Sequence, residues 1–280
     1  MRKIAYYFLI ASVSVTSAHA GLIVNQNVSG ANAAAIQPAV DAFRVTIGGG
    51  AVAGPNGLFG GVRREINWDG VPDGFSDPNS FPANFFNVNS PRGVVFSTAG
   101  SGFLTSADSS NPTATPTLFT DLNAGYAGVF QSFSAERIFG VVGSTDMDVN
   151  FFLPGTNTPG SVTSFGLVFV DNNLATFPSC ASIQAFNGAT SLGFFCATPA
   201  PSGGLSFLGV SATGSDVITR ISIHLGTGLL GSAQSAGNEV VVMDDFIFSN
   251  PVPEPSTMLL TLAGLGFAAA RLRSKSRPAR

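Results

Sequence analysis

Short segments rich in β-branched and aromatic residues, separated by clusters of Pro, Gly, Asn and Ser, run through the middle of this chain. The clearest is residues 217–225, where every second side chain is apolar and those between are polar. This is the pattern of a strand with one face in a core. Turn clusters such as residues 154–160 and 199–204 leave little room for long crossover helices. The pattern predicts an all-β fold, and we expect a jelly-roll-like β-sandwich.

Further strand segments are expected along the chain. They are residues 93–97, 128–133, 138–142, 148–153, 162–171, 183–186, 192–196, 205–210 and 240–249. Only residues 32–44 suggest a helix, and Pro38 should limit its length. The chain's 25 phenylalanines fit a sandwich core better than a ligand platform.

Residues 1–20 have the parts of a secretory signal peptide. A basic start and an apolar stretch over residues 4–15 precede a cleavage site formed by Ala18 and Ala20. The apolar stretch is too short for a transmembrane helix, which is the alternative. We therefore expect export through the Sec translocon and a mature chain that begins at Gly21.

The C-terminal segment, residues 251–280, also has three parts. They are a motif at 252–256 containing Pro253, Glu254 and Pro255, an apolar run at 257–270 and a basic tail at 271–280. A 14-residue helix is about 21 Å long, shorter than the ~30 Å hydrocarbon core of a bilayer. The basic tail holds this end on the cytoplasmic side. We expect a weak transmembrane helix that anchors the chain temporarily in the inner membrane.

This three-part tail resembles the PEP-CTERM sorting signal, the substrate of exosortases in Gram-negative bacteria. The resemblance implies that an exosortase cuts near residues 253–256 and that the protein reaches the cell surface or the medium. An ordinary C-terminal transmembrane helix is the alternative, but it would need a longer apolar run and no Pro-Glu-Pro.

Without these ends the ectodomain is residues 21–250, long enough for one large domain. Of the 13 Lys and Arg residues, two lie in the signal peptide and five in the tail, which leaves six arginines and no lysine. All but one of the 16 acidic residues remain, so the net charge is near −9. Nucleic acids and anionic lipid surfaces are poor partners for this domain, whereas cations and neutral polysaccharides are compatible with it.

Cys180 and Cys196 are the only cysteines and both belong to the ectodomain. Exported chains enter an oxidising compartment, so an intramolecular disulfide is expected. Closing a loop of this size stabilises a fold by about 3 kcal/mol. Free thiols or metal ligation are the alternatives, but no other cysteine or histidine lies nearby in the sequence.

Four carboxylates recur at every fourth position of a loop rich in Gly and Pro. They are Glu65, Asp69, Asp73 and Asp77. Such oxygen-rich loops suit Ca²⁺, which takes 6–8 oxygen ligands, although the spacing is not that of an EF-hand. The alternative is a series of turns in which Asp side chains bond their own backbone.

Asp244 and Asp245 lie next to each other within a long strand segment. Neighbouring residues of a strand point to opposite faces, so we expect one of the two carboxylates to be solvated. Their place near the end of the chain resembles the last strand of jelly-roll carbohydrate-binding modules, which implies a second candidate calcium site. An ion pair with Arg137 or Arg220 is the alternative.

Trp68 and Tyr126 are candidates for stacking on a sugar ring, with packing in the core as the alternative for Trp68.

His224 is the only histidine of the mature chain, because His19 leaves with the signal peptide. One histidine is too few for a multi-histidine zinc site and leaves a single candidate base for a Ser-His-Asp triad. A two-carboxylate glycosidase remains open, with Glu65, Asp69, Asp73 or Glu136 as candidates.

Residues 63–97, together with residues 242–246, resemble an uncharacterised ectodomain that recurs among PEP-CTERM proteins. This resemblance implies a β-sandwich outside the cell and assigns no activity. We expect a non-catalytic structural or adhesive component of an exopolysaccharide or biofilm matrix. The alternatives are a Ca²⁺-dependent carbohydrate-binding module and, second, a secreted glycosidase or lyase.

Overall fold

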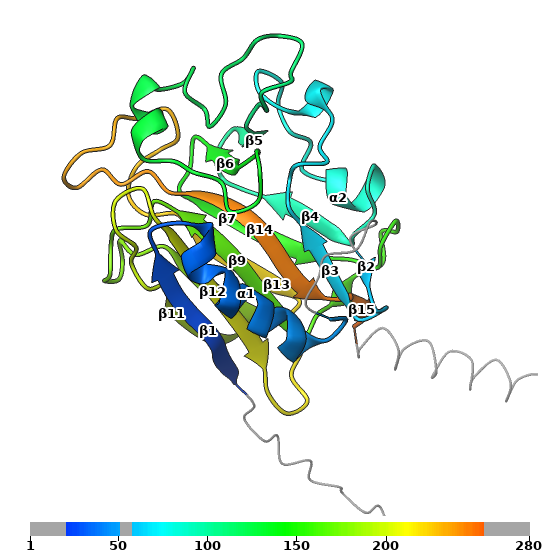
Figure 1. Ribbon diagram of the computed structural model, residues 1–280. Coiled ribbons are helices and arrows are strands. Elements are labelled where there is room, and N and C mark those ends of the chain that lie inside the picture. Colours follow the sequence, from blue (N-terminus) through cyan, green and yellow to red (C-terminus); the bar gives the residue numbers. More distant parts are fainter. Residues whose placement is uncertain (1–20, 51–57, 255–280) are drawn as a thin grey trace, which may run out of the picture.

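Two antiparallel sheets stacked face to face form the body of the protein, with one helix on the outside (Figure 1). The computed structural model describes residues 21–50 and 58–254. The expected β-rich ectodomain is confirmed, and so is its antiparallel character.

The larger sheet has eight strands in the order β1-β12-β9-β14-β3-β2, with β6 paired to β14 and β5 to β6. Their bounds are β1 (Leu22–Gly30), β2 (Leu58–Phe59), β3 (Arg63–Ile66), β5 (Gly102–Thr105), β6 (Phe139–Val142), β9 (Ser164–Val170), β12 (Leu205–Ala212) and β14 (Val242–Ser249). Strands β9 and β14 are buried along their whole length, because one sheet face meets the other sheet and the opposite face meets the helix and loops.

The smaller sheet has five strands in the order β11-β10-β13-β7-β4. Their bounds are β4 (Val94–Ser97), β7 (Asp146–Phe151), β10 (Ser182–Asn187), β11 (Thr190–Cys196) and β13 (Arg220–His224). Along β13, Ile221 and Ile223 are buried in the core while the side chains between them face outward. The alternation of apolar and polar side chains predicted for this segment is therefore present in the strand. It leaves a polar face of this sheet toward solvent.

Helix α1 (Ala33–Ile47) packs on the outer face of the larger sheet (Figure 1). Asn32 caps it, since its side chain accepts a hydrogen bond from Ala35 N at 3.1 Å. The helix continues past Pro38, further than expected, because Ile36, Val40 and Phe43 lie on one face and are fully buried.

Glycines in two adjacent strands make room for this helix. Phe43 lies edge-on to Phe207, with ring centroids 5.5 Å apart. A Cβ at Gly166 or Gly209 would come within 2.8 Å of the Phe43 ring. The small side chains thus let the helix approach the sheet closely.

The remaining elements are short. They are η1 (Asp73–Phe75), α2 (Phe85–Val88), η2 (Ala124–Gly128), β8 (Gly160–Ser161) and β15 (Val252–Pro253). The strand expected at residues 128–133 is not formed, because η2 is followed there by irregular chain. Strand β1 was not expected from the sequence, and its mixed burial pattern explains why.

Candidate functional site

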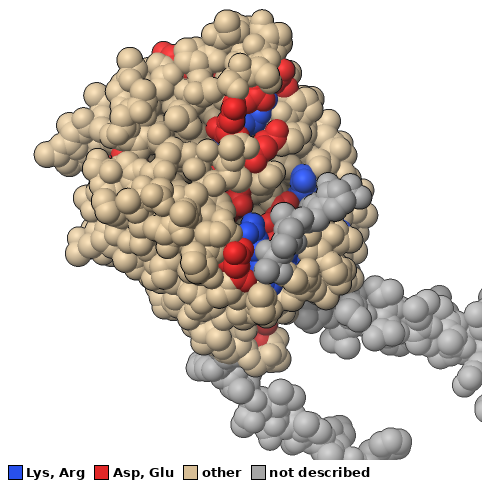
Figure 2. Space-filling view, viewed as in Figure 1, with Lys and Arg blue, Asp and Glu red and all other residues tan. Residues whose placement is uncertain are grey.

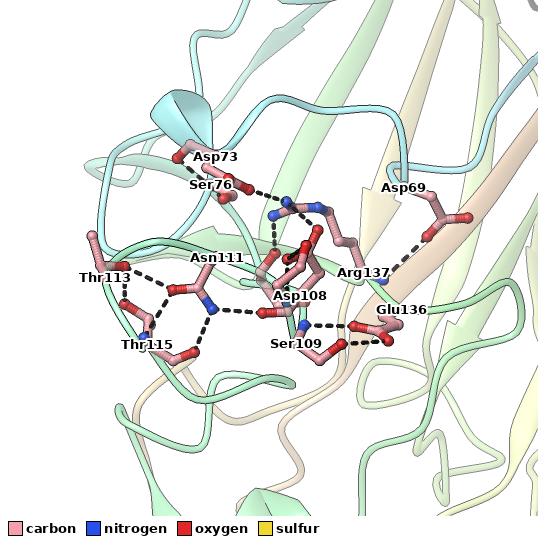
Figure 3. Close-up of polar contacts among 12 residues, drawn as sticks. Asp69, Asp73, Ser76, Asp108, Ser109, Asn111, Thr113, Thr115, Glu136 and Arg137 are labelled. Carbon is pink, nitrogen blue, oxygen red and sulfur yellow. Dashed lines mark hydrogen bonds and ion pairs between the residues drawn. The ribbon is translucent and has the colours of Figure 1, made fainter.

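Arg137 is the centre of the polar network into which part of the acidic loop is folded (Figure 3). It is 1% exposed, and its Nη2 lies 2.6 Å from Asp73 Oδ1 and 2.7 Å from Asp108 Oδ2. Its Nη1 donates to the Ser106 carbonyl at 2.9 Å, and its backbone N donates to Asp69 Oδ1 at 3.2 Å. One arginine therefore ties three loops together at the same point.

Glu136, beside it, holds the loop that contains Ser109 (Figure 3). The Ser109 backbone N and hydroxyl donate to its two carboxylate oxygens at 2.6 and 2.8 Å, and these hydrogen bonds lower the pKa of Glu136. Glu136 and Arg137 thus hold the loop of residues 106–109 against the chain before β6.

The four carboxylates expected to bind Ca²⁺ are not brought together. Glu65 is paired with Arg44 and Arg63, whereas Asp69 and Asp73 bind Arg137. Asp77 lies apart from them, 4% exposed, with Oδ2 lacking a hydrogen-bond partner. Among the described residues, no group of three or more His, Cys, Asp or Glu side chains is placed to hold a metal ion. The turns between these positions thus direct Glu65 toward Arg44 and Arg63, and Asp69 and Asp73 toward Arg137.

Asp244 and Asp245 are both buried, so the expectation that one is solvated is wrong. The pairing of β14 with β9 shifts between Asp244 and Phe246, and this bulge places Asp245 on the same buried side. Asp245 lies beside Arg44, with Nη2 3.4 Å from its Oδ2, and not beside Arg137 or Arg220.

Both aspartates accept hydrogen bonds from the chain before β6. Asp244 Oδ2 accepts from the backbone N of Phe133 at 2.7 Å, and Asp245 Oδ1 accepts from the Ser134 hydroxyl at 2.8 Å. Burial raises the pKa of Asp244 well above its usual range and that of Asp245 to about 7. The pair is therefore a buried structural element of the sheet, closed to an external ligand.

Neither predicted sugar-stacking ring reaches solvent. Trp68 is 1% exposed and stacks on Phe139 with ring centroids 3.9 Å apart. Tyr126 is fully buried, stacks on Phe130 and donates its hydroxyl to the Ser232 carbonyl at 2.8 Å. The packing alternative describes Trp68, and the same explanation extends to Tyr126.

A groove of about 570 Å³ lies on the solvent-facing side of the five-stranded sheet. Its floor is formed by outward-facing side chains of β7, β10 and β13, including Asp146, Asp148, Gln184, Ser222 and His224. A volume in the range ~300–1,000 Å³ is usual for ligand sites.

Ion pairs across strands organise the floor of this groove. His224 Nδ1 lies 2.8 Å from Asp146 Oδ1, and Arg220 Nη1 lies 2.8 Å from Asp148 Oδ1. The register of β13 against β7 sets the His224–Asp146 pair opposite each other. His224 is thus held by Asp146, while its Nε2 has no hydrogen-bond partner.

The rim of the groove carries exposed aromatic rings. Phe177 is 70% exposed and Phe194 37% exposed, and their rings meet edge to face with centroids 5.2 Å apart. The predicted disulfide between Cys180 and Cys196 is formed, which links the chain near both rings. No sequence signal marked Phe177, because its exposure depends on where the loop before β10 comes to lie.

The last described residues are joined to the folded body. β15 pairs antiparallel with β8, Val252 opposite Ser161 and Pro253 opposite Gly160. Pro251 is buried just before this pair. The first residues of the expected sorting motif therefore pair with the folded body in a separate two-stranded sheet, beyond the predicted ectodomain boundary at residue 250.

The profile of the PEP-CTERM protein-sorting motif matches residues 251–276. The chain carries a PEP-CTERM sorting motif. This motif indicates an exported protein that is processed by an exosortase and delivered to the cell envelope or surface. No curated protein and no solved structure matches the chain.

Several predictions about the two ends lie outside the described residues. They are the signal peptide at 1–20 with Ala18 and Ala20, Pro255 of the PEP-CTERM motif, the apolar run at 257–270 and the basic tail at 271–280. Within residues 21–50 and 58–254, no helix combines the length and apolar character needed to cross a membrane.

Proposed function

We propose that this PEP-CTERM protein is a non-catalytic, adhesive component of an extracellular polysaccharide matrix, and that its groove binds the polymer. The Sec translocon exports it, the inner membrane holds it transiently, and the exosortase then releases it to the surface. The observation that carries the proposal is the exposed Phe177–Phe194 pair at the rim of a groove whose floor carries polar side chains.

The chemistry of the groove suits a sugar polymer. The apolar rings of Phe177 and Phe194 offer contacts for the C–H faces of a sugar, and exposed aromatic patches usually mark binding surfaces. Asp146, Gln184 and Ser222 supply hydrogen-bond groups on the floor for its hydroxyls. An open groove along a sheet accepts an extended chain, whereas a closed pocket accepts only its end.

We also propose that the sandwich is a jelly roll, and the strand order supports this. The sheet order β3-β14-β9-β12 faces the order β4-β7-β13-β10-β11. With β7 regarded as an added strand, these orders follow from two Greek keys wound into facing sheets. In such a sandwich the outer face of one sheet is free to bind a ligand, and the groove lies on that face.

The test is binding of the exported protein, purified from an exosortase-positive host, to that host's exopolysaccharide. We expect Phe177→Ala with Phe194→Ala to weaken binding about tenfold, the equivalent of ~1.4 kcal/mol. Val88→Ala is the matched control, because Val88 is 62% exposed and does not line the groove. Equal binding by the groove variant and the control would refute the proposal.

The same assay separates the two rival functions. Binding that requires Ca²⁺ and is lost in EDTA would favour a calcium-dependent carbohydrate-binding module. Release of new reducing ends or unsaturated sugars during incubation would favour a glycosidase or lyase. We expect equal binding in Ca²⁺ and EDTA, and a polymer of unchanged length.

A further inference from the structure

A small cavity of about 40 Å³ lies between the turn after β3 and the segment that joins α2 to β4. Trp68, Phe86, Ser90 and Arg92 are among the residues that line it. Two donors in this lining, Trp68 Nε1 and Arg92 Nε, are buried and have no hydrogen-bond partner. Buried N–H groups are nearly always paired, so two such groups at one cavity indicate a missing acceptor.

The arginines around this cavity differ from the others of the body. Four arginines have a carboxylate within ion-pair distance: Arg44, Arg63, Arg137 and Arg220. No carboxylate among the described residues pairs with Arg64 or Arg92. This is unexpected in a domain where acidic residues outnumber basic ones, because a partly buried charge is normally compensated.

Neutral groups hold these two guanidinium groups in place. Arg64 Nε donates to Asn250 Oδ1 at 2.6 Å, and its Nη1 donates to the Pro91 carbonyl at 3.0 Å. Arg92 Nη1 donates to Ser90 Oγ at 2.7 Å, and its guanidinium lies 4.8 Å from the centre of the Phe86 ring. Burial, and then the charge of Arg64, lower the pKa of Arg92 to about 10.

We propose that the cavity is a binding site for one small anion, of the size of chloride or formate, held by Trp68 Nε1 and Arg92 Nε. The cavity exceeds the ~10–15 Å³ that a single water needs. A water also accepts N–H bonds, but it leaves the charge of the guanidinium group uncompensated. An anion accepts both bonds and also compensates the guanidinium charge.

Bound there, the anion links two parts of the chain that are otherwise joined mainly by aromatic packing. Trp68 follows β3 of the larger sheet, and Arg92 precedes β4 of the smaller one. The site therefore connects the two sheets at the end where the chain leaves toward its PEP-CTERM motif, since Arg64 also binds Asn250 there. This inference does not depend on the proposed polysaccharide binding.

Trp68 is the only tryptophan of the chain, so its fluorescence reports on this cavity alone. The experiment titrates the purified exported protein with bromide, a quencher close to chloride in size, and with caesium, a cationic quencher, at constant ionic strength. We expect bromide to quench the emission along a saturating curve that chloride shifts at least tenfold, and caesium to have no effect. Equal and weak quenching by both ions would overturn the proposal and leave a cavity that holds water only.

Thermal unfolding in chloride and in gluconate gives a second readout. A ligand that binds only the native state raises Tm, by about 3 °C or more at ten times its Kd for a domain of this size. We expect this rise in the native protein and in Arg220→Gln, and its loss in Arg92→Gln. An equal Tm in both salts contradicts the proposal, and if Arg92→Gln does not fold, the competition of bromide with chloride in the native protein decides alone.

Discussion

At the scale of single residues, Trp68 organises the aromatic part of the core. Five phenylalanine rings contact its indole ring: Phe81, Phe86, Phe96, Phe139 and Phe246. These rings come from both sheets and from the loops above them, so one side chain joins segments far apart in the sequence. A positive φ of 65° at Trp68 turns the chain so that the ring enters the core and not the solvent.

Replacing this ring should cost much of the protein's stability. We expect Trp68→Ala to lower the free energy of unfolding by about 3–5 kcal/mol, the usual cost of emptying a large aromatic site. The measurement is urea unfolding followed by circular dichroism. Phe177→Ala is the control, because a ring that is 70% exposed should change stability by less than about 0.5 kcal/mol. A loss under 1 kcal/mol for Trp68→Ala would contradict this view of the core.

At the scale of elements, the disulfide joins the start of β10 to the end of β11. Cys180 and Cys196 are 16 residues apart, and strands β10 and β11 lie between them as a hairpin. This hairpin is the edge of the five-stranded sheet and carries one side of the groove rim. The bond therefore limits both unfolding of the edge and movement of the rim.

Removing the disulfide should lower both the stability of the domain and its affinity for the polysaccharide. We expect Cys180→Ala with Cys196→Ala to cost about 3 kcal/mol, or roughly 6–12 °C in Tm. Polysaccharide binding at a temperature where the variant is folded should also weaken, because Phe194 is two residues from Cys196. A Tm unchanged by the double substitution would show that the loop is held by packing alone.

Strand β15 sets a limit on where the exosortase can cut. A peptidase needs its substrate strand free, and Val252 and Pro253 are already paired with β8. We expect the released protein to end at Glu254 or beyond, which mass spectrometry of the intact product measures. A product that ends before Glu254 would contradict this.

A variant of β8 tests the cause. A Cβ at Gly160 would lie 2.9 Å from the Phe152 carbonyl carbon, so Gly160→Ala should distort β8 and free β15. We expect a larger share of shorter products from Gly160→Ala and no change from Gly128→Ala. Gly128 is the matched control because a Cβ there meets no other atom within 4 Å.

At the scale of the whole molecule, charged side chains gather in a band, and the rest of the face in view is nearly free of them (Figure 2). Several carboxyl groups are buried as well as crowded. Burial, as the main cause, raises the pKa of Asp77, Glu239 and Asp245 to about 7, and that of Asp244 well above its usual range. In the unfolded chain the same groups ionise near pH 4.

This shift makes stability depend on pH in a defined direction. Between about pH 4 and 7 the folded protein binds more protons than the unfolded chain, so the free energy of unfolding falls as pH rises through this range. We expect a higher Tm at pH 5 than at pH 8. Asp77→Asn should raise the free energy of unfolding by about 1–2 kcal/mol at pH 8 and by little at pH 5. This is less than the energy equivalent of the whole pKa shift, because the neighbouring Asp121 is exposed and solvent screens its charge. A Tm that rises from pH 5 to 8 would contradict the prediction.

Features that depend on residues near each other in the chain were determined by the sequence alone. The alternation of β13, the helix near residues 32–44, the PEP-CTERM motif and the pairing of two cysteines in an exported chain are of this kind. Their physics acts within a few residues, or follows from the compartment that the chain enters.

Only the tertiary structure decided which charges meet and where the groove lies. Asp146 and His224 are 78 positions apart, and Arg44 and Asp245 are 201 apart, so no local pattern links them. The bulge after Asp244 reversed the expected exposure of its neighbour, because a shift of one residue in register moves a side chain to the other face. Three of the four carboxylates expected to bind Ca²⁺, Glu65, Asp69 and Asp73, contact arginines instead, because the packing of whole sheets determines which charges meet.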